Sequence, residues 1–321
     1  MTDKLVRISL TLLTVLLSIL VLGGPARADA DDGAYVISAT RNGRIVDLTI
    51  QSPALQGTGK ARLLLPTGWD AQPDRTWPVL YLLHGAGADQ TAWTTQTSAG
   101  YLTGLVGNTG VLVVMPDGGK CGAYSDWLSG PGWETFHLTE LRQILERAYR
   151  AGSERAVAGY SMGGFGAMSY AARHPGFFKG AVALSGAVDT RLATTVPGQP
   201  FIDGPTLVKQ AINLNCFGTP WQNLWGDDGA PGWAAHNPYD LAPYLTSTYL
   251  YVWSGDGNCD GCVFNPVEQS TRYQSEAFVR RLTALGIPVT AHFGTGDHSF
   301  TYWEPEFQAA FPSLMTSIGA S

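Results

Sequence analysis

The sequence predicts an α/β fold with a mostly parallel central sheet and helices on both faces. Short β-branched and apolar runs alternate with amphipathic helical patterns, and several of the runs are apolar throughout, as buried parallel strands are. The chain has 321 residues, 45% hydrophobic and 14% charged, a composition that excludes intrinsic disorder. The net charge of −6 comes with no block of like charges, which argues against a nucleic-acid or anionic-membrane partner.

The first 28 residues are expected to be a secretory signal peptide. Lys4 and Arg7 precede an apolar run over residues 8–22, and Ala26-Arg27-Ala28 supplies a cleavage site of the small-x-small type. An uncleaved anchor helix is the alternative, but the run is shorter than the roughly 20 residues that span a bilayer. We therefore expect residues 29–321 to form one domain that is secreted or held in the cell envelope, without stable membrane insertion.

The alternating pattern places the elements in order along this domain. Strands are expected at residues 44–51, 61–65, 79–84, 111–115, 155–160, 180–184, 248–254 and 288–293. Apolar residues recur at helical spacing over residues 138–148 and 278–285, and Gly286 ends the second of these helices. Because ligands of parallel sheets lie beyond the carboxyl ends of the strands, the loops after these strands are where chemistry is expected.

The stretch from about 189 to 244 breaks this rhythm. It is rich in Pro, Gly and Asn, and it contains Trp221, Trp225 and Trp233. We interpret it as an insertion over the active-site end of the sheet rather than as a separate domain.

Four cysteines, Cys121, Cys216, Cys259 and Cys262, indicate two disulfides in an exported chain. Three pairings are possible, and we favour Cys121–Cys216 together with Cys259–Cys262. A zinc site is a weaker interpretation, because a lone Cys-x-x-Cys has only scattered partners here. A thioredoxin-like role is disfavoured because this Cys-x-x-Cys does not open a helix. We expect no metal and no cofactor.

A Gly-x-Ser-x-Gly motif, residues 159–163, is the first candidate for chemistry. A nucleophilic serine at a strand-to-helix turn holds strained backbone angles, so neighbours without side chains prevent a clash, and the helix N-terminus favours developing negative charge. The motif alone is weak, since a Gly-rich β–α turn explains it equally well. Its setting, between a strand-like run at 156–158 and a helix-like run at 165–173, is the one a nucleophile requires. Ser161 is therefore the candidate nucleophile.

The loop after the strand at 79–84 continues as Gly85-Ala86-Gly87. In hydrolases of this architecture a flexible turn here points a backbone N–H at the acyl oxygen, and the N–H after the nucleophile supplies a second donor. Ala86 and Met162 are accordingly the candidate oxyanion donors. His84 is expected to order the loop rather than to act as the base.

The candidate base is His298, which follows the last strand. In the chain order Ser, acid, His, the base is the histidine nearest the C-terminus. The remaining histidines are expected to be structural: His137 on a helix, His174 before a proline, His236 in the insertion and His292 in a strand.

The acid partner of the base is left open by the residues themselves. Asp256 and Asp260 lie just after the strand at 248–254 and Glu268 a little later, and any of the three carboxylates suits the task. The run 256–261 also matches the opening of an EF-hand loop, but the closing Glu is replaced by Val267, which disfavours calcium.

These residues together resemble the antigen 85 and mycolyltransferase branch of the esterase D family, secreted α/β-hydrolases. The similarity covers most of the mature chain, and its segments are Val113-Val114-Met115-Pro116, Tyr124-Ser125-Asp126-Trp127, Trp133-Glu134-Thr135-Phe136, Ser161-Met162, Ser185-Gly186 and residues 298–303. The resemblance implies an α/β-hydrolase fold. The family's acid is a Glu followed by an Arg four residues on and a Phe ten residues on, a pattern that Glu268, Arg272 and Phe278 reproduce. Glu276 has similar neighbours and stays an alternative.

One departure bears on the substrate that the resemblance implies. Mycolyltransferases carry an Asp and an Arg in the oxyanion loop to hold trehalose, where this chain has His84 and Gly87; the His-Gly-x-Gly form is that of simple carboxylesterases. The implied protein is a secreted serine carboxylesterase or acyltransferase that takes small-molecule or lipid esters through an acyl-enzyme, with the apolar insertion as a wall for short-to-medium or aryl acyl groups. The alternatives are a mycolyl or diacylglycerol acyltransferase that uses trehalose or another alcohol, and a non-catalytic protein that binds the cell wall or matrix.

Overall fold

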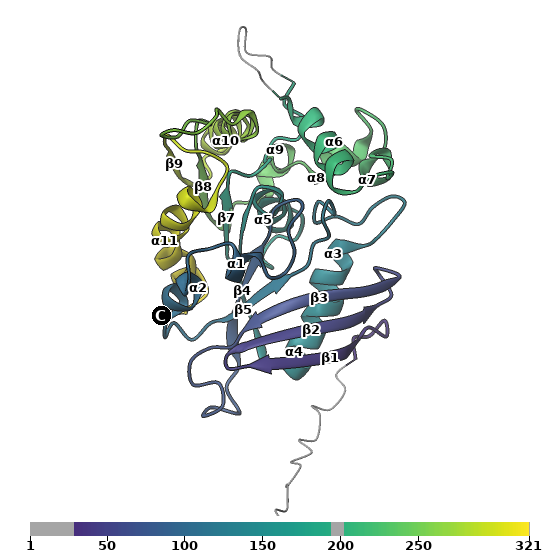
Figure 1. Ribbon diagram of the computed structural model, residues 1–321, viewed down its shortest axis with the longest axis vertical. Coiled ribbons are helices and arrows are strands. Elements are labelled where there is room, and N and C mark those ends of the chain that lie inside the picture. The colour runs from purple at the N-terminus through teal and green to yellow at the C-terminus, as the bar shows by residue number, and fades with distance from the viewer. Residues whose placement is uncertain (1–28, 194–201, 321) are drawn as a thin grey trace, which may run out of the picture.

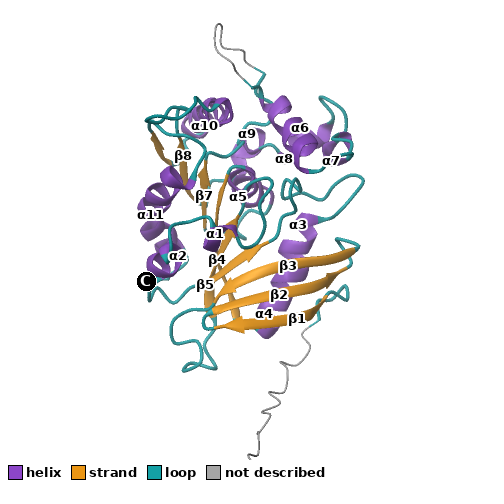
Figure 2. Cartoon of the chain, viewed as in Figure 1, coloured by secondary structure: helices purple, strands orange, loops and turns teal. Residues whose placement is uncertain are grey.

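The structure, a computed structural model, describes residues 29–193 and 202–320, so the expected signal peptide lies outside the described residues. A nine-stranded sheet with the order β1-β2-β3-β5-β4-β6-β7-β8-β9 forms its centre (Figures 1 and 2). The strands are β1 Tyr35–Asn42, β2 Ile45–Ser52, β3 Gly57–Leu64, β4 Trp77–Leu83, β5 Leu112–Pro116, β6 Ala151–Tyr160, β7 Gly180–Leu184, β8 Tyr249–Ser254 and β9 Thr290–Phe293. Neighbours from β5 to β9 pair in parallel, and those from β1 to β5 pair antiparallel. The mostly parallel sheet is thus confirmed.

Helices cover both faces of the sheet, as expected. They are α1 Ala92–Thr95, α2 Tyr101–Val106, α3 Trp133–Thr135, the π-helix η1 Phe136–Leu141, α4 Arg142–Ala148, α5 Met162–Arg173, α6 Gly204–Asn215, α7 Gln222–Trp225, α8 Pro231–His236, α9 Pro238–Leu241, the 3₁₀-helix η2 Ala242–Tyr244, α10 Pro266–Ala284 and α11 Phe300–Ser317. Because successive side chains of a strand point to opposite faces, Tyr81 and Leu83 of β4 pack with α4, α5 and α10, whereas Leu80 and Leu82 pack with α2 and α11.

The observed elements differ from the expected ones in several places; β3 begins at Gly57 instead of residue 61, and α10 begins at Pro266 instead of residue 278. β6 begins at Ala151, four residues before the expected start. β1 was not expected; it is an edge strand whose residues are mostly exposed, so its sequence lacks a buried apolar face. The helix expected over residues 138–148 starts as a π-helix, in which the buried Glu140 accepts hydrogen bonds from the Ser52 hydroxyl and the Ala54 N–H.

The helices α6, α7 and α8 lie at the upper end of the molecule in Figure 1, beyond the carboxyl end of β7. They share a separate apolar cluster with the N-terminal half of α5, in which Phe165 packs with Ile212, Trp225 and Trp233. Both expected disulfides are present, and Cys121–Cys216 joins the loop after β5 to the end of α6, with a Cα–Cα distance of 6.0 Å. Among the described residues, no helix is long and apolar enough to cross a membrane.

Candidate active site

Ser161 lies on a sharp turn between β6 and α5, at the carboxyl edge of the parallel strands. Its backbone has φ +56° and ψ −122°, a conformation that non-glycine residues rarely adopt. The turn closes tightly: a Cβ on Gly159 would lie 2.2 Å from the carbonyl oxygen of Gly163, and one on Gly163 would lie 2.3 Å from that of Leu83. The two glycines of the motif are therefore required by the close backbone approach, and the turn exposes the serine at the N-terminus of α5.

His298 and Glu268 are in direct contact. The imidazole Nδ1 lies 2.6 Å from Oε2 of Glu268, which is completely buried at the start of α10. Asn265 caps this helix by accepting hydrogen bonds from the backbone N–H groups of Val267 and Glu268. A carboxylate in the first turn of a helix is favoured by the helix dipole. The contact leaves Nε2 of His298 as the nitrogen available for another partner.

Three donors hold the other oxygen of Glu268. Oε1 accepts hydrogen bonds from Ser185 Oγ at 2.8 Å, from Ser254 Oγ at 3.0 Å and from the backbone N–H of Gly255. Trp303 donates its indole N–H to Ser185 Oγ at 2.8 Å, and its ring lies edge-on to His298 with 5.0 Å between ring centroids. This supporting shell fixes the carboxylate so that Oε2 faces the imidazole.

Sequence reasoning assigned no such role to Ser185, Ser254 or Trp303. The available signal was positional: Ser185 directly follows β7, and Ser254 ends β8, so both lie at the carboxyl edge where sites of parallel sheets gather.

The other candidate acids have different partners. Asp256 Oδ1 accepts hydrogen bonds from the backbone N–H groups of Asn258 and Gly296, and Asp260 is exposed. Glu276, eight residues beyond Glu268 on α10, forms an ion pair with Arg272. Of the four carboxylates weighed, Glu268 is the one in contact with His298.

His84 is buried behind the loop that carries Ala86. The backbone N–H of Gly118 donates to its Nε2 at 2.8 Å, so Nε2 is the acceptor and Nδ1 carries the proton that is donated to the carbonyl oxygen of Gly85. Both ring nitrogens are therefore occupied by the backbone, which matches the expected loop-ordering role. The backbone N–H of Gly87 in turn donates to the carbonyl of Lys120.

Tyr124 connects this loop to α5. Its hydroxyl donates to the carbonyl oxygen of His84 at 2.8 Å, and its ring lies against Gly166 of α5, where a Cβ would come within 2.5 Å of the ring. Tyr124 and Ala123 both have positive φ, strain that a packed site can hold. Burial raises the pKa of the Tyr124 phenol well above its usual range, so the hydroxyl stays a donor at working pH.

For the ester hydrolysis expected from the sequence, replacing Tyr124 with Phe is expected to lower kcat about 10-fold and to change KM little. This loss is smaller than the roughly 10²–10³-fold loss of kcat that follows removal of an oxyanion donor itself. The reason is that the His84 carbonyl loses its partner and the Ala86 N–H becomes less well fixed. Tyr170→Phe is the matched control, because it removes an equally buried hydroxyl that contacts His137 and not the loop. Steady-state kinetics of both variants make the comparison, and an equal loss of kcat in the two would contradict the account.

The remaining histidines lie outside this constellation. His137 is buried between Tyr170 and the carbonyl of Asp117, and burial lowers its pKa to about 4. His236 stacks on Trp225, and His292 contacts Glu306 on the surface.

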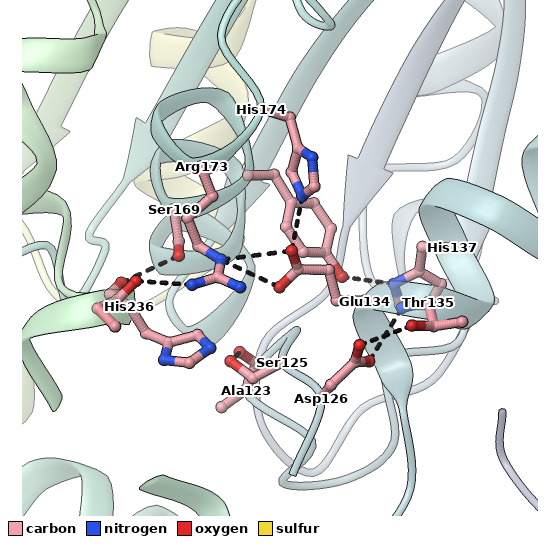
Figure 3. Close-up of polar contacts among 12 residues, drawn as sticks. Ala123, Ser125, Asp126, Glu134, Thr135, His137, Ser169, Arg173, His174 and His236 are labelled. Carbon is pink, nitrogen blue, oxygen red and sulfur yellow. Dashed lines mark hydrogen bonds and ion pairs between the residues drawn. The ribbon is translucent and has the colours of Figure 1, made fainter. Parts of the chain in front are cut away.

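An ion-pair network around the buried Glu134 supports the segments after β5. Figure 3 shows Glu134 between Arg173 and His174, and Asp126 facing Thr135. Burial alone would raise the pKa of Glu134, but the hydrogen bond from His174 and the charge of Arg173 outweigh it and lower the pKa. The network anchors α3 to the end of α5 and so holds the chain that carries Tyr124. Glu134 and Asp126 thus have structural contacts, and neither contributes to the cavity beside Ser161.

A cavity of about 250 Å³ lies beside Ser161. Its described lining is Ala86, Cys121, Ala123, Ser161, Met162, Phe165, Ala187, Thr190, Leu207, Val208, Gln210, Ala211, Ile212, Leu214, Asn215, Trp225, Val267, Thr271 and His298. The candidate nucleophile, base and both candidate oxyanion donors thus share one cavity. Met162 is the first residue of α5, whose initial N–H groups have no acceptor within the helix.

The chain is similar to proteins named as esterases and as acyltransferases. Residues 52–314 match the family described as "Putative esterase". Esterase Rv1288 of Mycobacterium tuberculosis is 32% identical over 263 residues, which cover 78% of this chain and 54% of that protein, so the chain spans about half the length of that relative. The diacylglycerol acyltransferase/mycolyltransferase Ag85B of Mycobacterium intracellulare is 31% identical over 266 residues, 76% of each chain.

The fold also has solved counterparts. The crystal structure of Mycobacterium tuberculosis MPT51 (FbpC1) superposes with a TM-score of 0.69 at 22% sequence identity, covering 84% of this chain and 97% of that one. At this identity the likeness concerns the fold alone, which is the α/β-hydrolase fold expected from the sequence.

Proposed function

This chain belongs to the esterase family, and from that premise we propose that it is a serine ester hydrolase that works through a covalent acyl-enzyme. The observation that carries the proposal is the contact of the buried Glu268 with His298 beside a strained serine in the same cavity. A base oriented by a carboxylate, in one cavity with a half-buried serine, is the set of groups that acyl transfer requires.

In the proposed reaction Ser161 Oγ attacks the ester carbonyl carbon while Nε2 of His298 takes its proton. Glu268 accepts a hydrogen bond from the Nδ1–H group, which fixes the tautomer and stabilises the imidazolium. The tetrahedral oxyanion is bound by the backbone N–H groups of Ala86 and Met162. His298 then gives its proton to the departing alcohol. A water molecule attacks the carbonyl carbon of the acyl-enzyme while His298 takes its proton, and His298 passes that proton to Ser161 Oγ as the bond to the serine breaks and the acid leaves.

The surroundings of Gly87 favour hydrolysis over transfer of the acyl group to a sugar, because they leave little room for a side chain at this position. A Cβ at this position, where mycolyltransferases carry Arg, would lie 2.7 Å from Oδ1 of Asn215 at the end of α6. The side chain of Asn215 thus lies beside the point from which a side chain at position 87 would start. The acyltransferase alternative rests on the similarity to mycolyltransferases, and it needs an alcohol that competes with water for the acyl-enzyme.

We also propose that the protein acts outside the cytoplasm, in the extracellular space or in association with the cell wall. Two disulfides suit an oxidising compartment, and residues 1–28 have the composition of a signal peptide. A non-catalytic binding role is the third hypothesis. The presence of Ser161, His298 and Glu268 together argues against it, since a binding protein does not need an oriented base.

A panel of p-nitrophenyl and alkyl esters, incubated with and without trehalose or glycerol as acceptor, tests this function. We expect carboxylic acid as the main product in both conditions. If the main product is an ester of trehalose or glycerol, the function is acyl transfer to an alcohol. Absence of any turnover, together with binding to isolated cell walls, would favour the non-catalytic alternative.

A further inference from the structure

We propose that the cavity beside Ser161 is an acyl pocket with a fixed inner end for compact, uncharged acyl groups, a single ring or a chain of about eight carbons at most, and that Trp225 sets the length limit. This inference rests on the proposed ester hydrolysis and names the acyl class of the same site. Its basis is the size of the cavity, the packing of its inner end and the chemistry of its lining.

The orientation of an ester in the cavity follows from the reacting groups. The leaving oxygen must lie beside His298, which protonates it, and the carbonyl oxygen must lie at the N–H groups of Ala86 and Met162. The acyl group is then directed to the part of the cavity farthest along α5 from Ser161, where Phe165 and Trp225 lie.

That inner end is a packed wall. Phe165, Ile212 and Trp225 are each at most 2% exposed. Trp225 is held by Phe165 with 5.5 Å between ring centroids, by Trp233 at 5.2 Å and by a stacked His236 at 5.3 Å. A side chain held on three sides cannot swing away without losing this packing, so the wall is fixed.

The side wall is anchored as well. Residues from Leu207 to Asn215 along α6 line the cavity, and the disulfide Cys121–Cys216 binds the end of this helix to the loop after β5. An apolar cavity of roughly 150 Å³ holds one benzene ring. The cavity of about 250 Å³ therefore has room for one ring with a small substituent or for a chain of about eight carbons. A long lipid chain therefore exceeds the cavity.

The lining defines the chemistry of the acyl group. Among the described lining residues, the only titratable side chain is that of His298, and most of the others are aliphatic or aromatic. A charged acyl group would lose its hydration here without gaining a partner. Alkyl acyl groups and rings that stack on Phe165 or Trp225 are the groups that this surface accommodates.

The test is a chain-length profile of kcat/KM for p-nitrophenyl esters from acetate to hexadecanoate. The unaltered protein is expected to peak at or below the octanoate and to fall at least 10-fold by the dodecanoate. Trp225→Ala is expected to move the optimum toward longer chains by about two to four carbons, because it opens the inner end by several methylene volumes. Trp221→Ala is the matched control: Trp221 packs on Trp233 in the same cluster but does not line the cavity.

Ala211→Leu gives an independent variant should Trp225→Ala fail to fold, and it is expected to move the optimum toward shorter chains because Ala211 lines the cavity on α6. A second series, acetate esters of alcohols of increasing size, is expected to show no change of preference in either variant. Three results would overturn the inference: rates of the unaltered protein that keep rising to the hexadecanoate, an equal shift in Trp221→Ala, or a shift in alcohol preference instead of acyl preference. Turnover of none of these esters by the unaltered protein would contradict the proposed function itself, which separates the two failures.

Discussion

Ser161→Ala is expected to lower kcat for p-nitrophenyl ester hydrolysis by about 10⁴-fold or more, since loss of a serine nucleophile in comparable triads costs up to roughly 10⁶-fold. The variant removes the oxygen that forms the acyl-enzyme and leaves the cavity and the oxyanion donors in place. KM is expected to change little, because the ester still meets the same walls. Initial rates at saturating substrate, with each preparation checked by its melting temperature, provide the measurement.

Ser169→Ala supplies the matched control for this substitution. Ser169 lies on the same helix, α5, and its hydroxyl donates to the carbonyl of His236 away from the cavity. We expect it to retain activity within about two-fold and to lose at most about 1–3 kcal/mol of stability, the cost of an unsatisfied buried acceptor. Comparable losses of kcat in the two variants would mean that the serine at the turn has no special chemical role.

Glu268→Gln is expected to lower kcat by about 10³–10⁴-fold, the range seen when a triad carboxylate becomes an amide. The amide oxygen of the glutamine can accept the same three hydrogen bonds that Oε1 accepts, so the NH₂ group is turned toward His298. An NH₂ donor forces Nδ1 to act as acceptor, which places the proton on Nε2. In that tautomer the imidazole cannot take the proton of Ser161.

Two variants test whether this loss is specific to Glu268. Glu276→Gln breaks an ion pair with Arg272 on the same helix, and Asp256→Asn alters a carboxylate bonded to loop backbone. Each is expected to keep kcat within about five-fold. A loss in Glu276→Gln or Asp256→Asn that exceeds the loss in Glu268→Gln would assign the acid to that residue instead.

Most of the fold can be predicted from the sequence because buried parallel strands appear as short apolar runs. All eight expected strands are present. Most of them are apolar runs bounded by turns, and β2 shows the alternation of a half-buried strand. The edge strand Tyr35–Asn42 escaped prediction because its side chains are largely exposed and its stability comes from pairing with β2, which a local pattern does not record. The π-helix η1 before α4 was not predicted for a similar reason: Glu140 accepts hydrogen bonds from residues nearly 90 positions away in the chain.

Different parts of the candidate site differ in how visible they are in the sequence. Ser161 and His298 follow strands within short motifs, so local spacing and chain order are enough to propose them. Glu268 lies 30 residues from His298 and at the start of a helix, and only the resemblance to a known family distinguished it from Asp256 and Asp260. The hydrogen bond between Trp303 and Ser185 joins residues 118 positions apart, and no rule of sequence spacing predicts such a contact.

The measurement that tests the central claim most directly is the mass of the protein after reaction with an alkyl fluorophosphonate. Attack by Ser161 Oγ on phosphorus expels fluoride and leaves a stable phosphonate ester on the serine. We expect one adduct per chain, located at Ser161 by peptide mapping, formed in parallel with complete loss of esterase activity and strongly slowed in Glu268→Gln. Ester turnover that persists after Ser161 is fully labelled, active protein in which the reagent forms no adduct, or an adduct at another residue that abolishes activity would contradict the account.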